Sequence, residues 1–373
     1  MKTMKRIMAL LLVLTLTLGM TVCLAEEEEE EELTLDDSLF MEEEDWDEEF
    51  ADLLISDDIA EVIEDLDKWE VDTSVNPDDL ELNTDLPDHI VNILLIGIDT
   101  HSKTMDANAG LQHNDVNMIL SINTETGSLK LTSILRDLYV QIPGYKTKSR
   151  INNAYARGGG QLAMKTINHN FNLNIQNYVT INFFGLASII ESIGGIDVEL
   201  TKGEAYAINK YIKDHPPVYD TKEHSERIPL EVVDGEQHLD GIQAVMYARL
   251  RTGMKTGNGD FNRTARQRKL LELLLNKILQ DMSLNRLNEL ITTTLPYVTT
   301  NVNGGTIFSL AMSVLSSDII SRARSGEELI EQHRVPMDKT YGYLDVDGAS
   351  VLNLSSENWR ANVNAVHAFI YGN

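Results

Sequence analysis

An arginine-rich segment, "YARLRTGMKTGNGDFNRTARQR", runs from residue 247 to residue 268. It contains five arginines and one lysine against a single acidic residue. A guanidinium group presents a planar fork of N–H donors that fits two phosphate oxygens at once, whereas a lysine acts as a point charge. The preference for arginine therefore predicts a binding site for a phosphate-type anion, with a solvated helix face and ordinary ion pairs as the alternative.

Spacing divides the charged residues of this segment into two groups. Arg249 and Arg251 are two residues apart and lie on one face if the backbone is extended. Asp260, Arg263 and Gln267 follow the i, i+3, i+7 pattern of one helix face. The preceding glycine and Asp260 mark a helix N-terminus, whose unpaired N–H groups favour anions.

Two other arginines of the segment lie at other positions around the predicted helix. Arg268 falls about 100° further round the predicted helix than Gln267, so we expect it to be a solvated charge. Arg266 lies between the two faces, and its spacing favours neither role.

Three acidic residues lie at the ends of predicted strands. Asp99 ends the apolar run "IVNILLIGID", and Asp115 precedes "VNMILSIN". Ligands of α/β proteins bind beyond strand ends, and a pair of carboxylates suits a hard cation such as Mg²⁺. A helix cap or turn is an equally good interpretation of Asp99. Arg136 and Asp137 directly follow the run "LTSIL", where an exposed ion pair is the alternative.

The elements that must position these residues alternate between strands and helices. Apolar runs or alternation predict strands at 90–99, 116–123, 128–135, 178–183 and 194–200. Helical spacing predicts helices at 158–171, 184–193, 238–249, 260–282, 287–298, 306–315 and 358–372. This order predicts an α/β protein in three layers, with a central, mostly buried, mixed sheet flanked by helices.

The net charge of −28 is concentrated in one part of the 373-residue chain. Residues 26–88 hold 30 Asp and Glu and one basic residue, which predicts an acidic, disordered linker. Residues 89–373 hold 29 acidic and 27 basic residues, so the predicted folded domain is nearly neutral. A short basic face on a neutral domain does not suit nucleic acid, which requires a broad basic surface.

The N-terminal 25 residues resemble a targeting segment. Basic residues precede an uncharged stretch from residue 7 to residue 25, and small residues lie before Glu26. A cleaved signal peptide and a retained N-terminal membrane anchor are both open, and either predicts export of the rest of the chain. Cys23 is the only cysteine, so the exported part has no disulfide.

Seven ordered segments between Ile90 and Lys277 resemble the LytR-CpsA-Psr family. They include "NILLIGIDT", "HNDVNMILSIN", "LTSILRDLYVQIPG", "RINNAYARGGG" and "GDFNRTARQRKLL". The resemblance implies an extracytoplasmic phosphotransferase of the cell envelope, with residues 89–373 as its catalytic domain. Such an enzyme moves a glycopolymer, for example teichoic acid or capsule, from a polyisoprenyl pyrophosphate lipid to a peptidoglycan hydroxyl. An apolar lipid-binding tunnel, work at the membrane surface and a pyrophosphatase side activity belong to the same expectation.

The resemblance also assigns roles by position. Asp99 and Asp115 would hold Mg²⁺ or Mn²⁺. Catalytic roles would fall to Arg136, Asp137 and Asp260. The residues that would surround the pyrophosphate are Arg136, Arg249, Arg251, Arg263 and Gln267.

The chain departs from the family pattern at two positions. His101 and His113 stand where the family usually has arginine. Histidine is mostly neutral above about pH 6.5, so two cations are lost or become pH-dependent. The chain is therefore either an enzyme with a weaker anion clamp or a non-catalytic module that binds polyprenyl phosphate.

Overall fold

A six-stranded mixed sheet forms the centre of the protein. The computed structural model describes residues 71–99, 114–214, 228–251, 259–280, 297–302 and 318–372. The strand order is β10-β3-β2-β1-β6-β9. The strands are β1 (Ile90–Ile98), β2 (Asn114–Asn123), β3 (Leu129–Ile134), β6 (Asn177–Asn182), β9 (Val298–Thr300) and β10 (Ile330–Val335). The β1–β6 and β3–β10 pairs are parallel and the other three are antiparallel.

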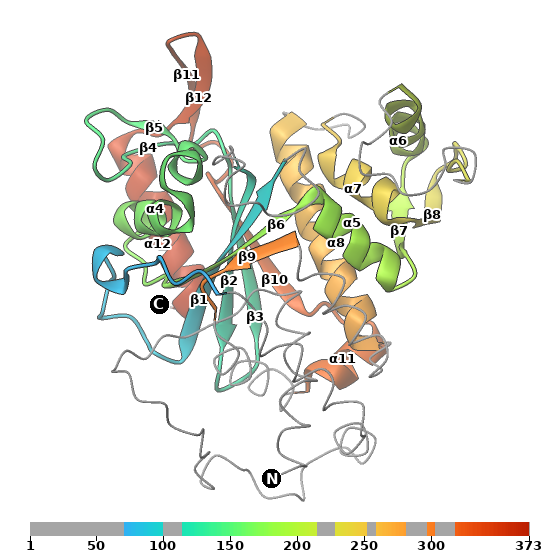
Figure 1. Ribbon diagram of the computed structural model, residues 1–373, viewed down its shortest axis with the longest axis horizontal. Helices are drawn as coiled ribbons and strands as arrows, with labels where there is room; N and C mark the ends of the chain where they lie inside the picture. The colour runs from blue at the N-terminus through green and yellow to red at the C-terminus, as the bar shows by residue number, and fades with distance from the viewer. Residues whose placement is uncertain are drawn as a thin grey trace, which may run out of the picture.

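Helices cover both faces of this sheet (Figure 1). One face packs against α4 (Asn153–Phe171) and α12 (Ser356–Tyr371), and the other packs against α5 (Phe183–Ser192), α7 (Gly241–Arg249), α8 (Gly259–Gln280) and α11 (Ile319–Ser325). Each interface holds its own cluster of buried apolar side chains. Strand β1 is almost wholly buried because its continuous apolar run contributes to both clusters. The predicted three-layer α/β architecture is confirmed.

Smaller elements surround the core. A side lobe contains α6 (Lys202–Asp214) and the antiparallel pair β7 (Ile196–Leu200) and β8 (Gly235–Leu239). The other short elements are η3 (Pro77–Asp79), the pair β4 (Tyr139–Val140) and β5 (Ser149–Arg150), and the hairpin of β11 (Gly342–Val346) and β12 (Ala349–Asn353). The described residues contain no helix long and apolar enough to cross a membrane.

The structure corrects several predicted elements. The predicted helix at 238–249 begins only at Gly241, because the preceding residues form β8. The strand predicted at 194–200 is β7, which pairs with β8 outside the central sheet. The helix predicted at 287–298 does not include Val298, which begins β9. Most of that helix, the one at 306–315, residues 1–70, His101 and His113 lie outside the described residues.

The last part of the predicted acidic linker packs on the domain. The Asp72 backbone N–H donates to the Thr300 carbonyl at 2.8 Å, and the Tyr178 hydroxyl donates to the Asp72 carboxylate. Leu80 is fully buried, and Lys165 of α4 pairs with Asp79. The folded domain therefore begins before residue 88, the predicted end of the linker. The acidic composition of this segment gave no sign of its contacts with β6, β9 and α4.

A buried ion pair joins α6, α7 and α8. Arg266 of α8 is fully buried, and its Nε donates to Glu204 of α6 at 2.8 Å. Its Nη1 donates to the Leu250 carbonyl, just after α7, at 2.8 Å. The other Glu204 oxygen accepts from the Thr201 backbone and hydroxyl. Because the charges and most of their hydrogen bonds are satisfied internally, the pair fixes α6, α7 and α8 relative to one another.

Close packing at the start of α7 requires a glycine. Asp240 caps this helix through a capping box with Gln243. A Cβ atom at Gly241 would lie 2.1 Å from the Ala187 carbonyl oxygen of α5, and the Gly241 N–H donates to Glu191 at 3.1 Å. The contact is with backbone, so α5 and α7 would have to separate to admit a side chain.

We expect Gly241→Ala to lower the free energy of unfolding by about 1–3 kcal/mol, the usual cost of overpacking. The matched control is Gly203→Ala in α6, where the added Cβ would meet no atom closer than 3.9 Å. That exposed change should be neutral or stabilising by up to about 1 kcal/mol. Urea unfolding of both variants measures the difference, and equal stability would contradict the close packing.

Candidate active site

A bulge in the sheet aims the first site residue. In the β1–β2 pair, Gly97 lies opposite Val116, but Ile98 lies opposite Asn114. Asp115 is therefore an extra residue that no β1 residue faces. Bulges of this kind bend a strand and redirect one side chain, and they are frequent beside active sites. Asp99 directly follows β1, so both predicted metal ligands come from the same end of adjacent strands.

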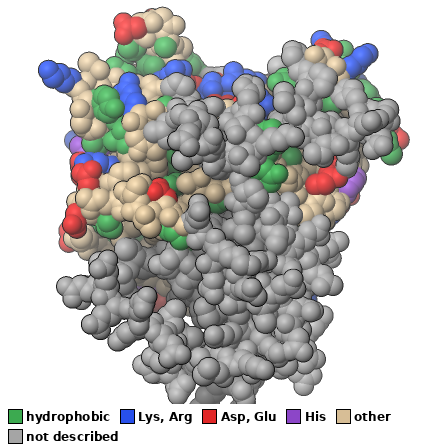
Figure 2. All heavy atoms as spheres, viewed as in Figure 1, with side chains coloured by type: hydrophobic (Ala, Val, Ile, Leu, Met, Phe, Trp, Pro, Cys, Tyr) green, Lys and Arg blue, Asp and Glu red, His purple; other side chains and the backbone are tan. Residues whose placement is uncertain are grey.

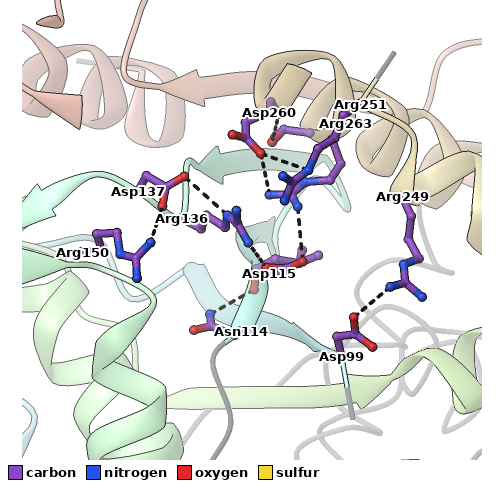
Figure 3. A network of polar contacts seen from close by, with 12 residues as sticks. Asp99, Asn114, Asp115, Arg136, Asp137, Arg150, Arg249, Arg251, Asp260 and Arg263 are labelled. Carbon is purple, nitrogen blue, oxygen red and sulfur yellow. Dashed lines mark hydrogen bonds and ion pairs between the residues drawn. The ribbon is translucent and has the colours of Figure 1, made fainter. Parts of the chain in front are cut away.

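Asp115 is held by two arginines from different elements (Figure 3). Its Oδ1 lies 2.5 Å from Arg136 Nη1, and its Oδ2 lies 3.2 Å from Arg263 Nη1. Arg136 follows the end of β3, and Arg263 lies in the first turns of α8. The two oxygens of one carboxylate thus join the sheet to the long helix.

Two further carboxylates orient these arginines. Asp260 Oδ1 lies 3.0 Å from Arg263 Nη2 and 3.6 Å from Arg251 Nε. Asp137 lies 3.4 Å from Arg136 Nε on one oxygen and 3.3 Å from Arg150 Nη1 on the other.

Arg150 is a site residue that sequence reasoning missed. It reaches Asp137 because the short β4–β5 pair brings Tyr139 opposite Arg150. A two-residue strand pair leaves no periodic signal in the sequence, although the segment "RINNAYARGGG" belongs to the family resemblance.

Arg249 forms the second part of the site, at the end of α7. Its Nη2 lies 2.8 Å from Asp99 Oδ2. Its guanidinium also lies over the Phe183 ring at 4.7 Å and near the Tyr211 ring at 5.8 Å. Cation–π contact fixes the plane of the guanidinium while leaving its edge for an anion.

Burial sets the charges of the central residues. The Arg263 side chain is only 4% exposed, and burial lowers its pKa. Burial alone would raise the pKa of Asp115, but Arg263 and Arg136 outweigh it, so the pKa of Asp115 lies below its ordinary value. Burial opposes the charge of Arg136 as well, yet Asp115 and Asp137 raise its pKa. Asp115 and Arg136 therefore keep their charges across the neutral range.

We call this set the carboxylate–arginine network. Its members are Asp99, Asp115, Arg136, Asp137, Arg150, Arg249, Arg251, Asp260 and Arg263. Space-filling atoms show Lys and Arg side chains gathered along the upper edge of the molecule, at the end of the sheet where the network lies (Figure 2).

The remaining arginine-segment residues have different positions. Gln267 is half-buried one turn after Arg263 and has no hydrogen bond to the network within the described residues. The expectation that Arg268 is a solvated charge is wrong. Its Nε donates to Gln332 of β10 at 2.9 Å, and burial with nearby Arg334 lowers its pKa to about 10. Arg268 faces the sheet because α8 packs on β3, and its partner Gln332 lies in β10.

The donor chemistry of Asp99 and Asp115 fits a hard cation, but both carboxylates already face guanidinium groups. Among the described residues, no group of three or more His, Cys, Asp or Glu is placed to hold a metal ion. Two acidic ligands from the protein therefore suffice only if the bound anion supplies further oxygens, which is the usual arrangement for Mg²⁺ at phosphate sites.

Two relatives show what the chain resembles in sequence. The polyisoprenyl-teichoic acid–peptidoglycan teichoic acid transferase TagU of Enterococcus faecalis is 33% identical over 201 residues, covering 54% of this chain and 58% of that protein. Biofilm regulatory protein A of Streptococcus mutans is 30% identical over 218 residues, covering 57% and 50%. The chain therefore matches little more than half the length of these relatives.

Solved structures share the fold. Protein gbs0355 of Streptococcus agalactiae aligns with a TM-score of 0.58 and 23% identity, covering 75% of this chain and 88% of that chain. TagT of Bacillus subtilis with bound octaprenyl pyrophosphate aligns with a TM-score of 0.52 and 19% identity, covering 76% and 91%. The family model LytR_cpsA_psr matches residues 57–367, which is most of the chain. This protein therefore belongs to the LytR-CpsA-Psr family.

Proposed function

We propose that this chain transfers a glycopolymer from a polyisoprenyl pyrophosphate carrier to a hydroxyl of peptidoglycan, outside the cytoplasmic membrane. One observation carries the proposal. Each oxygen of Asp115, on its bulge, faces an arginine from a different element, and further arginines lie at Asp99, Asp137 and Asp260. A cluster so rich in guanidinium groups suits a compact, highly charged anion such as a pyrophosphate.

Relatives support the identity of the substrates. TagU is named for transfer of teichoic acid from a polyisoprenyl carrier to peptidoglycan, and TagT has been seen with octaprenyl pyrophosphate. The transferred polymer could equally be teichoic acid, capsule or another envelope polymer, because the network would contact only the pyrophosphate.

The chemistry follows from the charges. The acceptor hydroxyl oxygen forms a bond to the phosphorus that carries the glycopolymer and loses its proton to solvent. The bridging P–O bond breaks, and polyisoprenyl monophosphate leaves with the bond's electron pair. Arg136, Arg249, Arg251 and Arg263 would hold the phosphate oxygens and stabilise the charge that develops on them. Asp137 and Asp260 would act on Arg136 and Arg263, holding each guanidinium in its orientation.

A magnesium or manganese ion fits the proposal as a partner of the pyrophosphate. Asp99 and Asp115 would hold it, and it would supply further neutralisation of phosphate charge. Because these carboxylates pair with Arg249, Arg136 and Arg263, the same guanidinium groups would be available to the phosphate oxygens of the bound anion.

An apolar path for the lipid chain is consistent with the packing below the network. Val116, Gly97 and Ile181 form a row across β2, β1 and β6. Val116 and Ile181 are partly buried and pack against the cluster under α5 and α8. A Cβ atom at Gly97 would lie 2.8 Å from Val116, so the glycine leaves no side chain between Val116 and Ile181 on this face of the sheet. We propose that the isoprenoid tail lies over this row, with the headgroup at Asp115.

Direct transfer tests the proposal. The full-length protein is incubated with Mg²⁺, a polyprenyl pyrophosphate-linked saccharide and uncrosslinked peptidoglycan, and glycan-bound phosphodiester is measured by mass spectrometry. We expect covalent attachment and release of polyprenyl monophosphate. Absence of both products, with an active family member as the positive control, would refute the enzyme.

We expect Arg251→Ala to weaken binding of farnesyl pyrophosphate by about ten- to a hundredfold, since a charge-assisted hydrogen bond contributes about 1.5–3 kcal/mol. The Arg251 side chain is 50% exposed, so its removal should leave the melting temperature nearly unchanged. The control is Arg360→Ala, an exposed arginine on α12. Isothermal titration calorimetry measures both. Equal affinities for the two variants would remove Arg251 from the site.

The histidines at 101 and 113 give a pH prediction. Below about pH 6.5 they gain a proton and a charge that favours an anion. Asp115 and Arg136 keep their charges over this range because the pKa of Asp115 is lowered and that of Arg136 is raised. The double variant His101→Arg/His113→Arg should therefore bind farnesyl pyrophosphate only slightly better than wild type at pH 5.5, and about tenfold or more better at pH 8.

Both proteins are titrated with the same ligand, so protonation of the ligand itself cancels from the ratio of affinities. A ratio that does not change with pH would contradict a role for these histidines near the anion. The same variant separates enzyme from binding module. If wild type shows no transfer and the double variant does, the natural chain is the non-catalytic polyprenyl-phosphate-binding module.

A further inference from the structure

The β11–β12 hairpin projects from the body of the domain at the end of the sheet that carries the network (Figure 1). Four of the five residues of β11 are exposed, on both faces of the strand. Tyr343 is 60% exposed and Leu344 is 42% exposed. Large exposed side chains on a projecting hairpin are not needed for a core, and they form a surface that a ligand can reach.

The base of this hairpin is fixed to the network. The Leu352 N–H of β12 donates to the Asp137 carbonyl at 2.9 Å, and Leu352 forms a bridge with Leu138. Val351 and Leu352 are 2% and 4% exposed, so they anchor the hairpin in the domain. Asp137 thus orients Arg136 through its carboxylate and holds the hairpin through its backbone carbonyl.

A row of aromatic rings leads from the network to the hairpin. Phe261 follows Asp260 in α8 and stacks on Tyr341, with ring centroids 5.0 Å apart and planes at 24°. Tyr341 meets Tyr343 edge to face, at 5.9 Å and 89°. The Arg334 guanidinium covers Phe261 at 4.3 Å. Tyr343 and Asp345 alternate along β11 and lie on one face, and Tyr341, which directly precedes the strand, contacts Tyr343.

We propose that this face of the hairpin, formed by Tyr341, Tyr343 and Asp345, binds the glycan chain of the acceptor. A pyranose ring has an apolar C–H face and a rim of hydroxyl groups. The tyrosine rings offer flat apolar surface with a polar edge. Asp345 Oδ1 accepts from the Gly348 N–H at 3.0 Å, and the second carboxylate oxygen can accept from a sugar hydroxyl. The identity of the glycan as the acceptor rests on the proposed function, whereas binding of a saccharide here does not.

Geometry favours the acceptor over the carrier lipid. The lipid headgroup belongs at the arginines, and the isoprenoid row lies below them in the sheet. The aromatic row begins beside Asp260 and runs outward to solvent. A saccharide along that row would extend from the reaction site and place one of its hydroxyl groups near the pyrophosphate.

Charge favours a saccharide over a bilayer as the occupant. Residues 340–353 contain Asp345 and Asp347 and no lysine or arginine. An anionic lipid surface attracts basic segments and repels acidic ones. An uncharged, hydroxyl-rich glycan is not repelled by the two aspartates.

The test uses full-length protein and a soluble tetramer of β-1,4-linked N-acetylglucosamine, without lipid or metal. Removing the ring in Tyr343→Ala should weaken binding by about three- to tenfold, the effect of losing one aromatic contact. Tyr343→Phe keeps the ring and should remain within about twofold of wild type. Leu344→Ala is the matched control, because it removes an exposed apolar side chain from the opposite face of the same strand. Titration calorimetry or ligand-observed NMR gives the affinities.

Hydrogen exchange gives a second measurement that needs no substitution. In wild type, the tetramer should slow exchange in residues 341–346 and leave α12 unchanged. The proposal is overturned if Tyr343→Ala binds like wild type, if Leu344→Ala loses as much affinity, or if exchange is unaffected. It is also overturned if Tyr343→Ala loses binding to phosphatidylglycerol vesicles while keeping saccharide affinity, because the hairpin would then be a membrane contact.

The two proposals fail in different ways. If the protein transfers no glycopolymer but Tyr343→Ala weakens binding of the tetramer, the transferase is refuted and the saccharide site is supported. If transfer is normal and the KM for peptidoglycan does not rise in Tyr343→Ala, the transferase is supported and the saccharide site is refuted.

Discussion

The arrangement of the site depends on the two carboxylate oxygens of Asp115, a β2 residue that no β1 residue faces. Asp115 lies on the β2 bulge and faces Arg136 on one side and Arg263 on the other. Arg263 is nearly fully buried, and an unpaired guanidinium there would cost several kcal/mol, on the order of a lost buried ion pair. Asp115 therefore fixes the distance between the central sheet and α8, because it binds Arg136 after β3 and Arg263 in α8.

Other contacts keep that distance fixed. Arg266, one turn from Arg263, pairs with Glu204 and binds the carbonyl of Leu250. Leu250 lies between Arg249 and Arg251, so one buried side chain holds the backbone that carries two site arginines. Gly241 lets α7 lie directly on α5 at the other end of the same helix. The backbone that carries Arg249 and Arg251 is thus held in place by buried contacts.

Strong local patterns were sufficient to predict the layers of the fold. The apolar run of β1 and the helical spacing of α8 predicted a central sheet with helices on it, and the resemblance assigned the residues that converge at Asp115. The sequence could not predict β9 and β10, because their pairing depends on contacts far apart in the chain. Arg150 was missed because the two-residue β4–β5 pair, which brings it to Asp137, leaves no periodic signal in the sequence. Arg268 was misjudged because spacing gives the direction of a side chain but not what packs against it.

The contacts of Asp72 have a mechanical consequence. This residue is bonded to Thr300 and Tyr178, and Asp79 is bonded to Lys165 of α4. Tension applied through the upstream chain would load these contacts at the β6–β9 edge and at α4 first. The opposite side of the sheet, where α8 meets β3 and β10, would bear little of that load. Pulling on the N-terminal segment would then detach that segment before it separated the arginines from Asp115.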